Sequence, residues 1–329
     1  MKRAERHTGK LAGAVLAATL ALSTTAASAA EKINYLLPAP AVLPAFAPWM
    51  LAKHLGYYKA EGYDVTFVRA KGGVDVAKQV GVGNAPVGGG LGDTPIIVRP
   101  NGIPVRSVAL LGGGALMVVV ARGDRGITTP AMLKGKTVSV MSYQDTTYYA
   151  LLGTLASAGL TKKDLKILAV GPRNVPGFVI AGKADACACV PDWEIYVKGA
   201  LKNKVVSMPS QRYFPSMAQA ILASDKTIKE RPKLVAGIVR ATLKGLKFIM
   251  DDPDKAAIAY VKAVPAHKGK EKLMAAILRN FTERTYKGQK VLGMMDGATL
   301  GKLQDSYMKM GIIRRKTAVN ELYTNAFVK

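Results

Sequence analysis

Two aspartates occupy corresponding places in a short internal repeat. The segment from Gly72 to Asp93 matches the segment from Gly171 to Asp192 at six positions, with a constant offset of 99 residues. In both copies a loop with glycine, a short helix and a strand precede the aspartate, and ligands of open α/β sheets lie at the carboxyl ends of strands. We therefore expect Asp93 and Asp192 to face each other across a cleft, unless each one only caps a helix.

The glycine-rich run before the first aspartate, "GNAPVGGGLGDTP", is not a phosphate-binding loop of a known kind. It lacks the Gly-Lys-Ser/Thr of a Walker loop, and no register of it fits G-x-G-x-x-G. Glycine also permits close approach of the backbone to a neighbour or a ligand. We interpret the run as a strand end and its exit loop, in which Gly92, Asp93 and Thr94 are candidate ligand-binding residues and Pro95 enters a helix.

Loops after the other predicted strands supply further candidates. The helix that starts in "MSYQDTT" offers free N–H groups and hydroxyls to an anion, unless Ser142 or Asp145 simply caps it. Arg173 either holds an oxyanion or lies on the surface, whereas Trp49 is expected in the core. Aromatic side chains in this set can stack on a planar solute. These candidates are Pro38, Ala39, Lys71, Gly72, Ser142, Tyr143, Thr146, Arg173, Asn174, Asp192, Trp193 and Tyr213.

Few residues are suited to catalysis or metal binding. Of three histidines, His54 and His267 lie outside the N-terminal segment, and their spacing fits no zinc site. Cys187 and Cys189 share one face of a predicted strand, where adjacent positions rarely satisfy disulfide geometry without strain. We therefore favour two buried cysteines that act as small apolar side chains, while their redox state stays open. We expect no catalytic residue, no metal and no cofactor.

The elements that must position these residues alternate between strands and helices. Short runs rich in Val, Ile and Leu alternate with helical stretches up to about residue 218, which is typical of a mostly parallel α/β sheet. From about Lys226 the pattern changes to successive amphipathic helices, such as "KERPKLVAGIVRATLKGLKFIMDD".

The N-terminus and the charge bear on localisation and partners. Residues 1–30 combine a basic start, a short apolar run and small residues before Ala30, which predicts a secretory signal peptide cleaved after Ala29 or Ala30. The formal net charge is +25, but the lysines are scattered and no aromatic residues alternate with them. We interpret the charge as a solvated surface and expect no nucleic acid partner.

Three segments resemble one class of periplasmic binding proteins. They are "GYYKAEGYDVTFV", "ITTPAMLKGKTVSV" and "AGKADACACVPDWE", and the similarity extends from about Glu31 to Asp252. The class comprises the nitrate-, sulfonate- and taurine-type solute-binding components of ABC importers, together with those for thiamine-pyrimidine precursors. The sequence departs from the class where its Glu-Pro is replaced by Pro191-Asp192-Trp193-Glu194.

The resemblance implies a type II periplasmic binding protein with two α/β lobes. Each lobe would be a mostly parallel sheet flanked by helices, and two crossover strands, around 111–119 and 213–218, would form the hinge. Lobe 1 would comprise 31–115 and 216–329, and lobe 2 would comprise 116–215. The expected protein is a periplasmic monomer that delivers a small-molecule solute to a membrane permease.

The candidate pocket has mixed charge. Lys71 and Arg173 favour a carboxylate or sulfonate, whereas Asp93 and Asp192 favour an amino group or ring N–H and disfavour nitrate. A taurine-like zwitterion, an amino-pyrimidine and a polar aromatic acid all fit. Two other functions stay open: a pyrimidine-precursor biosynthetic enzyme, which in relatives uses a cysteine-rich iron site and a histidine, and a binding protein that serves a sensor kinase.

Overall fold

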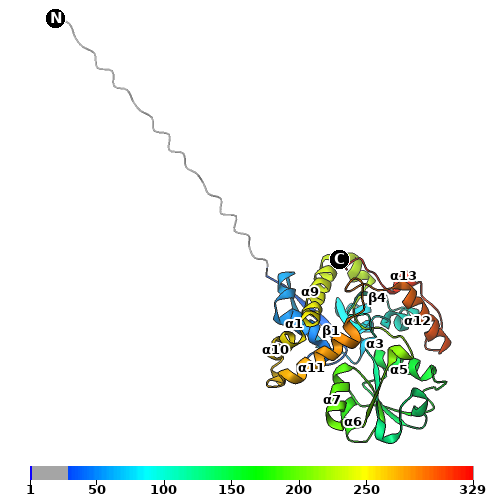
Figure 1. The fold of residues 1–329 in the computed structure, drawn as a ribbon. Helices are drawn as coiled ribbons and strands as arrows, with labels where there is room; N and C mark the ends of the chain where they lie inside the picture. Colours follow the sequence, from blue (N-terminus) through cyan, green and yellow to red (C-terminus); the bar gives the residue numbers. More distant parts are fainter. Residues whose placement is uncertain (2–28, 329) are drawn as a thin grey trace.

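The computed structural model describes residues 1 and 29–328. The predicted signal peptide falls almost entirely on residues 2–28, which lie outside the described residues. Within the described part of the chain, no helix combines the length and the apolar character that crossing a membrane requires. Figure 1 shows two groups of elements, with the green segment of the chain below and the blue, yellow and orange segments above.

The first sheet is built from both ends of the folded chain. Its strand order is β2-β1-β3-β10-β4, and β10 runs antiparallel to both of its neighbours while β1, β2 and β3 run parallel. We call the half of the molecule built on this sheet lobe 1. Its strands are β1 (Glu31–Leu37), β2 (Tyr63–Arg69), β3 (Val87–Leu91), β4 (Val105–Leu110) and β10 (Gln219–Ser224).

The second sheet repeats this arrangement. Its strand order is β7-β6-β8-β5-β9, and β5 runs antiparallel to both of its neighbours while β6, β7 and β8 run parallel. We call the half built on this sheet lobe 2. Its strands are β5 (Val118–Arg122), β6 (Thr137–Val140), β7 (Lys166–Ala169), β8 (Ala186–Cys189) and β9 (Val205–Pro209).

The central strands are apolar because helices cover both faces of each sheet. Every residue of β3, β8 and β10 is buried, as are the first four residues of β5. The edge strand β7 has no buried residue, which suits its position at the end of the second sheet. The two-lobed α/β fold predicted from the sequence is confirmed.

The long helices after the last strand pack mainly on lobe 1. In Figure 1, α9, α10 and α11 lie beside α1, and α12 lies on the other side of β4. The helices of lobe 1 are α1 (Ala47–His54), α2 (Tyr57–Ala60), α3 (Gly73–Gly81), α4 (Thr94–Val98), α8 (Asp225–Glu230), α9 (Pro232–Asp251), α10 (Pro253–Ala263), α11 (Glu271–Phe281), α12 (Gly297–Lys309) and α13 (Val319–Leu322).

Lobe 2 has fewer helices, and shorter turns complete both lobes. Its helices are α5 (Thr146–Ala156), α6 (Val175–Ile180) and α7 (Pro191–Leu201). The 3-10 turns are Pro44–Phe46, Arg99–Asn101, Gly123–Arg125, Pro130–Leu133, Ser210–Arg212 and Pro265–His267, and a π-helical turn, Thr282–Tyr286, follows α11 directly.

The chain crosses between the lobes twice. The crossings run from β4 to β5 and from β9 to β10, and they lie side by side, since the N–H of Ala115 donates to Oε1 of Gln211 at 3.1 Å. The predicted crossover positions agree with these connections, although the crossing segments themselves are irregular and regular strand begins only at Val118 and Gln219. The lobe boundaries at 115 and 216 stay a prediction.

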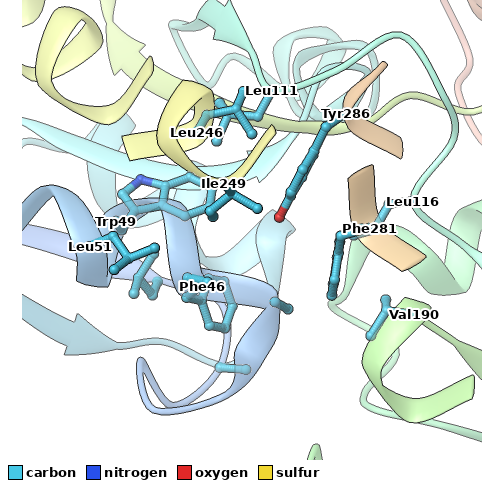
Figure 2. Close-up of a cluster of buried hydrophobic side chains, with 14 of the residues drawn as sticks. Phe46, Trp49, Leu51, Leu111, Leu116, Val190, Leu246, Ile249, Phe281 and Tyr286 are labelled. Atoms are coloured by element: carbon cyan, nitrogen blue, oxygen red, sulfur yellow. The ribbon is translucent and has the colours of Figure 1, made fainter. Parts of the chain in front are cut away.

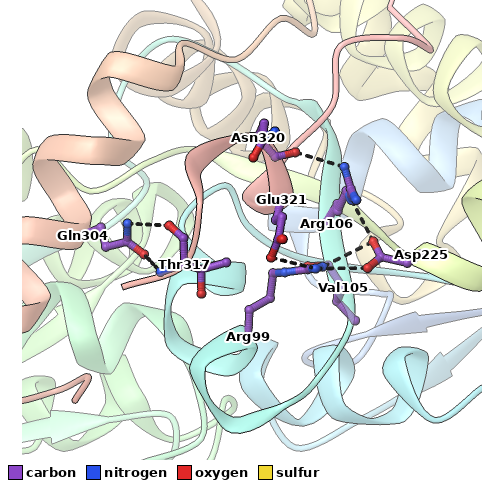
Figure 3. A network of polar contacts seen from close by, with 8 residues as sticks. All are labelled: Arg99, Val105, Arg106, Asp225, Gln304, Thr317, Asn320 and Glu321. Atoms are coloured by element: carbon purple, nitrogen blue, oxygen red, sulfur yellow. Dashed lines mark hydrogen bonds and ion pairs between the residues drawn. The ribbon is translucent and has the colours of Figure 1, made fainter. Parts of the chain in front are cut away.

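A polar network fastens the C-terminal segment to lobe 1. Asp225, at the start of α8, binds Arg99 at 3.0 Å and Arg106 at 2.7 Å. Arg99 also contacts Glu321 at 3.4 Å, and Arg106 donates to the carbonyl of Asn320 at 2.9 Å (Figure 3). The chain end is therefore part of lobe 1.

The two cysteines correct one expectation. Cys187 and Cys189 are fully buried, but they are joined by a disulfide. Their Cα atoms are 5.2 Å apart, which is shorter than the roughly 6.6 Å expected of two residues in extended strand and within the usual range for disulfides. The favoured interpretation as two small apolar side chains failed because it assumed an ideally extended strand.

Candidate functional site

A cavity lies between the two lobes, at the carboxyl ends of β1, β3, β6 and β8. This is the edge at which open α/β sheets place ligands. Residues of both lobes contribute, together with Gln219 at the start of β10. The lining comprises Pro38, Ala39, Leu43, Ala45, Phe46, Trp49, Gly73, Gly89, Gly90, Leu91, Leu116, Met141, Asp145, Thr146, Thr147, Val190, Asp192, Trp193 and Gln219.

The wall of the cavity is largely apolar and aromatic. Phe46 and Trp49 meet edge to face, with ring centroids 5.9 Å apart, and Trp193 lies on the lobe 2 side. Figure 2 shows Phe46 and Trp49 on one side of this cluster, with Leu116 and Val190 on the other. Flat apolar groups pack well against such walls. Among the described residues that line the cavity, none is lysine, arginine or histidine.

Asp192 is the outstanding polar group of the cavity. Its side chain is fully buried, and neither carboxylate oxygen is hydrogen-bonded to any residue that the structure describes. Burial raises the pKa of Asp192 to about 7, because the charged form loses its hydration; nearby backbone N–H groups, including that of Ala45, oppose this shift. A buried carboxylate without partners is costly to maintain. It therefore marks a position where a ligand can donate hydrogen bonds.

Gln219 adds a second free acceptor. Its Nε2 donates to the carbonyl of Ala45 at 2.8 Å, which fixes the orientation of the amide, while its Oε1 has no partner. Asp145 also lines the cavity but is engaged: it accepts from the N–H and hydroxyl of Thr147 and, at 3.4 Å, from the N–H of Gly73. Burial raises the pKa of Asp145 as well. The free polar groups are thus mainly acceptors.

Three tyrosines surround Asp192. The negative charge of Asp192 adds to burial in raising the pKa of Tyr196, Tyr260 and Tyr286. The hydroxyl of Tyr260 donates to the carbonyl of Val42 at 2.8 Å, whereas that of Tyr286 is buried without a partner. Figure 2 shows the Tyr286 hydroxyl directed into the cluster of buried side chains. A phenol carries no positive charge in either protonation state, so these three tyrosines supply no cation to balance Asp192.

The predicted site residues fall into several groups. Pro38, Ala39, Thr146, Asp192 and Trp193 line the cavity. The loop after the first strand and the start of α7 are therefore where the sequence pattern placed them.

A second group of predicted residues joins the lobes, and of these only Thr146 also lines the cavity. The hydroxyl of Ser142 donates to the carbonyl of Lys71 at 2.7 Å, and the hydroxyls of Thr94 and Thr146 are 3.0 Å apart. A Cβ on Gly72 would lie 2.5 Å from the carbonyl oxygen of Gln144, so the two backbones touch there. We call this contact the α3–α5 seam.

Asp93 lies apart from its counterpart. It precedes α4, whereas Asp192 is the second residue of α7, and it is not part of the cavity lining. One oxygen of the buried Asp93 accepts from the hydroxyl of Tyr307 at 2.6 Å, because α12 covers this end of lobe 1. The neighbouring Gly92 is packed against Leu110 and Met217. The two aspartates therefore do not meet in this cavity.

The remaining predicted residues lie further away. Arg173 and Asn174 are exposed on the loop before α6, and the Asn174 amide donates to the carbonyl of Val170 at 2.9 Å. Tyr143 is half exposed and donates to the carbonyl of Ile167 at 3.0 Å. Tyr213 lines a separate groove between α5 and α12.

Sequence patterns missed many of the lining residues, and two cases show why. Leu43, Phe46 and Trp49 follow the first strand along the same loop and helix, so extending the predicted loop beyond Ala39 would have found them. Gln219 lies on β10, which returns from lobe 2 and carries no local signal for a ligand site.

A family model described as NMT1/THI5 like matches residues 43–256 of the chain. This range begins at the cavity loop and extends into α10, so it includes Asp192 and Gln219.

Individual relatives are more distant. The riboflavin-binding protein RibY of Chloroflexus aurantiacus is 25% identical, with 86% of this chain and 82% of that protein covered. A 4-amino-5-hydroxymethyl-2-methylpyrimidine phosphate synthase of Saccharomyces cerevisiae, THI13, is 26% identical over 71% of this chain and 72% of its own length. The structure of the alkanesulfonate-binding protein SsuA of Xanthomonas axonopodis, bound to MOPS, has a TM-score of 0.71 and 17% identity, with 90% and 98% covered; this likeness shows the fold. With a family model matching well over half of its length, the chain belongs to the NMT1/THI5-like family.

Proposed function

We propose that the protein is the solute-binding component of an ABC importer and captures a flat, nitrogen-bearing organic solute between its lobes. The observation that carries this proposal is the buried carboxylate of Asp192, which lies in an aromatic cavity without a partner for either oxygen. A solute with two adjacent N–H groups would satisfy both oxygens and remove the cost of burying them.

The charges of the cavity narrow the class of solute. No lysine, arginine or histidine is present among the described lining residues, so no positively charged side chain there compensates a sulfonate, nitrate or carboxylate. Near Asp192, an anion would meet repulsion in a medium of low dielectric constant. Of the three solutes that fit the sequence, a pyrimidine-like heterocycle with amino or ring N–H groups is the one supported by the cavity.

Two relatives favour the same chemistry. RibY is named for riboflavin, and the yeast enzyme for an aminopyrimidine. Both compounds contain a flat nitrogen heterocycle that carries an N–H donor on its edge. By analogy with periplasmic relatives, we further propose that this protein works in the periplasm after removal of residues 1–30 and delivers the solute to a membrane permease.

Thermal-shift measurements test the proposal. A panel would include an aminopyrimidine, riboflavin, taurine and nitrate, each with wild-type protein and with Asp192→Asn. A ligand at 100 times its Kd adds about 2.7 kcal/mol of stability. We expect this stabilisation from a heterocycle and its loss in Asp192→Asn. Asp93→Asn is the matched control, since Asp93 is equally buried but does not line the cavity. A shift with taurine or nitrate alone, or an unchanged shift in Asp192→Asn, would contradict the proposal.

A biosynthetic enzyme is the alternative, because the yeast relative is named a synthase. The cysteine and histidine ligands of the iron site implied by the resemblance are not matched here. Cys187 and Cys189 are bonded to each other, and neither His54 nor His267 lines the cavity. Metal analysis of the purified protein decides: stoichiometric iron would support the enzyme. A third function is a binding protein that serves a sensor kinase, and the identity of the neighbouring genes would distinguish it from an importer component.

A further inference from the structure

We propose that Arg284 and Asn280 of lobe 1 are positioning residues for solute binding: they hold the first turn of α7 in lobe 2 and thereby keep Asp192 at the cavity. This inference rests on the proposed function for its role in binding, but the contact between the lobes can be tested by itself. We call Arg284, Asn280 and Glu194 the closure clasp.

The closure clasp joins the two lobes through three hydrogen bonds, and a fourth links its two lobe 1 side chains. Nη2 of Arg284 donates to Oε1 of Glu194 at 2.7 Å. Nδ2 of Asn280 donates to Oε2 of Glu194 at 3.2 Å and to the carbonyl of Pro191 at 3.0 Å. Nε of Arg284 donates to Oδ1 of Asn280 at 3.1 Å, so the two lobe 1 side chains also fix each other. Both carboxylate oxygens of Glu194 are therefore bound from the opposite lobe.

Burial of Glu194 raises the free-energy cost of losing these contacts. The Glu194 side chain is fully buried, whereas Arg284 keeps 27% of its side-chain surface exposed. Lys198, one turn along α7, binds the same Oε1 at 2.6 Å from within lobe 2. Removal of one partner of a buried charge pair leaves the other charge short of compensation, which costs much more than the loss of a surface ion pair. The closed arrangement of the lobes thus depends on Arg284.

The contact is also specific to this side of the cavity. Among residues 29–328, Arg284 and Glu194 form the one ion pair that joins the lobes. The α3–α5 seam on the other side uses backbone hydrogen bonds, such as that from the N–H of Val74 to the carbonyl of Gln144 at 3.0 Å, and the contact of the buried Asp145 with the N–H of Gly73. Among the described residues, only the closure clasp therefore pairs opposite charges across the lobes.

The closure clasp holds the first turn of α7, which carries Asp192, the proposed ligand-binding residue. Asp192 and Trp193 line the cavity, and the flanking Pro191 and Glu194 are the residues bound by lobe 1. A solute that contacts both Asp192 and lobe 1 brings the same turn toward Arg284. Solute binding and formation of the clasp therefore favour each other.

The hinge fixes where Arg284 can lie. Arg284 belongs to the π-helical turn Thr282–Tyr286, and such turns are frequent at functional sites. The N–H of Gly114, in the first crossing segment, donates to the carbonyl of Thr285 at 3.0 Å. A Cβ on Gly114 would lie 2.0 Å from the carbonyl oxygen of Arg284. The hinge backbone thus touches the turn that carries the clasp.

Three variants test the closure clasp. Arg284→Met keeps the aliphatic length and removes the charge, and Arg284→Lys restores a charge without the planar guanidinium. Arg279→Met is the matched control, because Arg279 lies on α11 but pairs with Asp254 of lobe 1 at 2.6 Å. Stopped-flow binding gives the association and dissociation rates for the heterocycle found by thermal shift, and small-angle X-ray scattering gives the radius of gyration without solute.

We expect Arg284→Met to raise the dissociation rate about tenfold or more, with the association rate changed by less than about twofold. Arg284→Lys should recover part of the loss, and Arg279→Met should match the wild type. The radius of gyration of free Arg284→Met should exceed that of the wild type. Should Arg284→Met fail to fold by circular dichroism, Glu194→Gln, which keeps the shape of the side chain, replaces it.

The outcomes separate the two proposals. Unchanged dissociation and an unchanged radius of gyration in Arg284→Met would overturn the closure clasp while leaving solute capture intact. If no solute binds the wild type but Arg284→Met still expands the free protein, the proposed function fails and the clasp is supported.

Discussion

At the scale of single residues, the structure assigns different roles to two aspartates that the sequence presents as equivalent. Asp93 and Asp192 occupy matching positions of the repeat, and both are fully buried. Tyr307 occupies one oxygen of Asp93, whereas both oxygens of Asp192 are left for a ligand. The difference arises because α12 covers one aspartate and a cavity adjoins the other.

The buried carboxylate of Asp192 predicts a specific dependence of stability on pH. Its pKa is raised from 3.8 to about 7, so the folded protein holds a proton that the unfolded chain has released. This contribution to stability is therefore present at pH 4, declines as pH rises toward 7, and stays absent above. Asp192→Asn lacks this contribution. We therefore expect its free energy of unfolding, relative to that of the wild type, to rise by roughly a few kcal/mol as pH rises from 4 to 8.

Chemical denaturation of both proteins at several pH values measures this difference. Asp93 and Asp145 also have raised pKa values and depend on pH in the same direction. The comparison of wild type with variant cancels their contribution. A difference in stability that stays constant from pH 4 to 8 would contradict the raised pKa.

Only some residues of the candidate site could be predicted from the sequence. The position of Asp192 and Trp193 at the cavity could be predicted because they follow a strand in a repeated pattern. Arg173 and Lys71 could not, because exposure depends on how each loop leaves its sheet. Gln219 could not be found at all, since it reaches the cavity only through a strand that returns from the other lobe.

At the scale of elements, the glycines of the first crossing segment are a structural requirement. The N–H of Gly113 donates to the carbonyl of Lys287 at 3.1 Å, and Gly112 has φ of +133°. A Cβ on either Gly112 or Gly114 would come within 2.0 Å of the backbone of the π-helical turn. A side chain here must displace the backbone of the turn.

We therefore predict that Gly114→Ala lowers the free energy of unfolding by roughly 1–3 kcal/mol, as overpacking typically does. Gly199→Ala is the control: its Cβ would meet nothing within 4 Å on α7, and alanine favours helix. Urea denaturation of both variants measures the effect. Equal stability of the two variants would show that the hinge tolerates the extra methyl group.

The elements themselves were predicted well where hydrophobic periodicity is strong. The alternating strands and helices of both lobes and the long helices from α9 onward follow the sequence pattern. At Thr129 and Pro130, a possible cap residue followed by proline favours a helix start, but only the 3-10 turn Pro130–Leu133 forms. The cysteine pair was missed because a small contraction of the strand, invisible in the sequence, brings the two sulfurs into bonding range.

At the scale of the whole molecule, the two lobes share one plan. Both sheets have the same relative order and one antiparallel strand, placed next to the edge strand on one side. The repeat between residues 72–93 and 171–192 predicted this similarity. The packing of α11 against α7, which carries the closure clasp, could not be predicted because it joins segments with no shared pattern.

We predict that the protein is a monomer with and without solute. The whole cavity is lined by one chain, and the formal net charge of +25 opposes association of identical copies. Sedimentation equilibrium over a range of concentrations should give the mass of a single chain. A mass that rises with protein concentration at physiological salt would contradict this prediction.

The position of β10 also constrains the order in which the molecule can be assembled. This strand inserts between β3 and β4, although β4 ends at Leu110 and β10 begins only at Gln219. All five strands of the second sheet are synthesised in between. The first sheet therefore lacks the strand between β3 and β4 until lobe 2 has been synthesised. Closing that gap brings together residues distant in the chain, which slows folding. The first sheet is thus completed after the second.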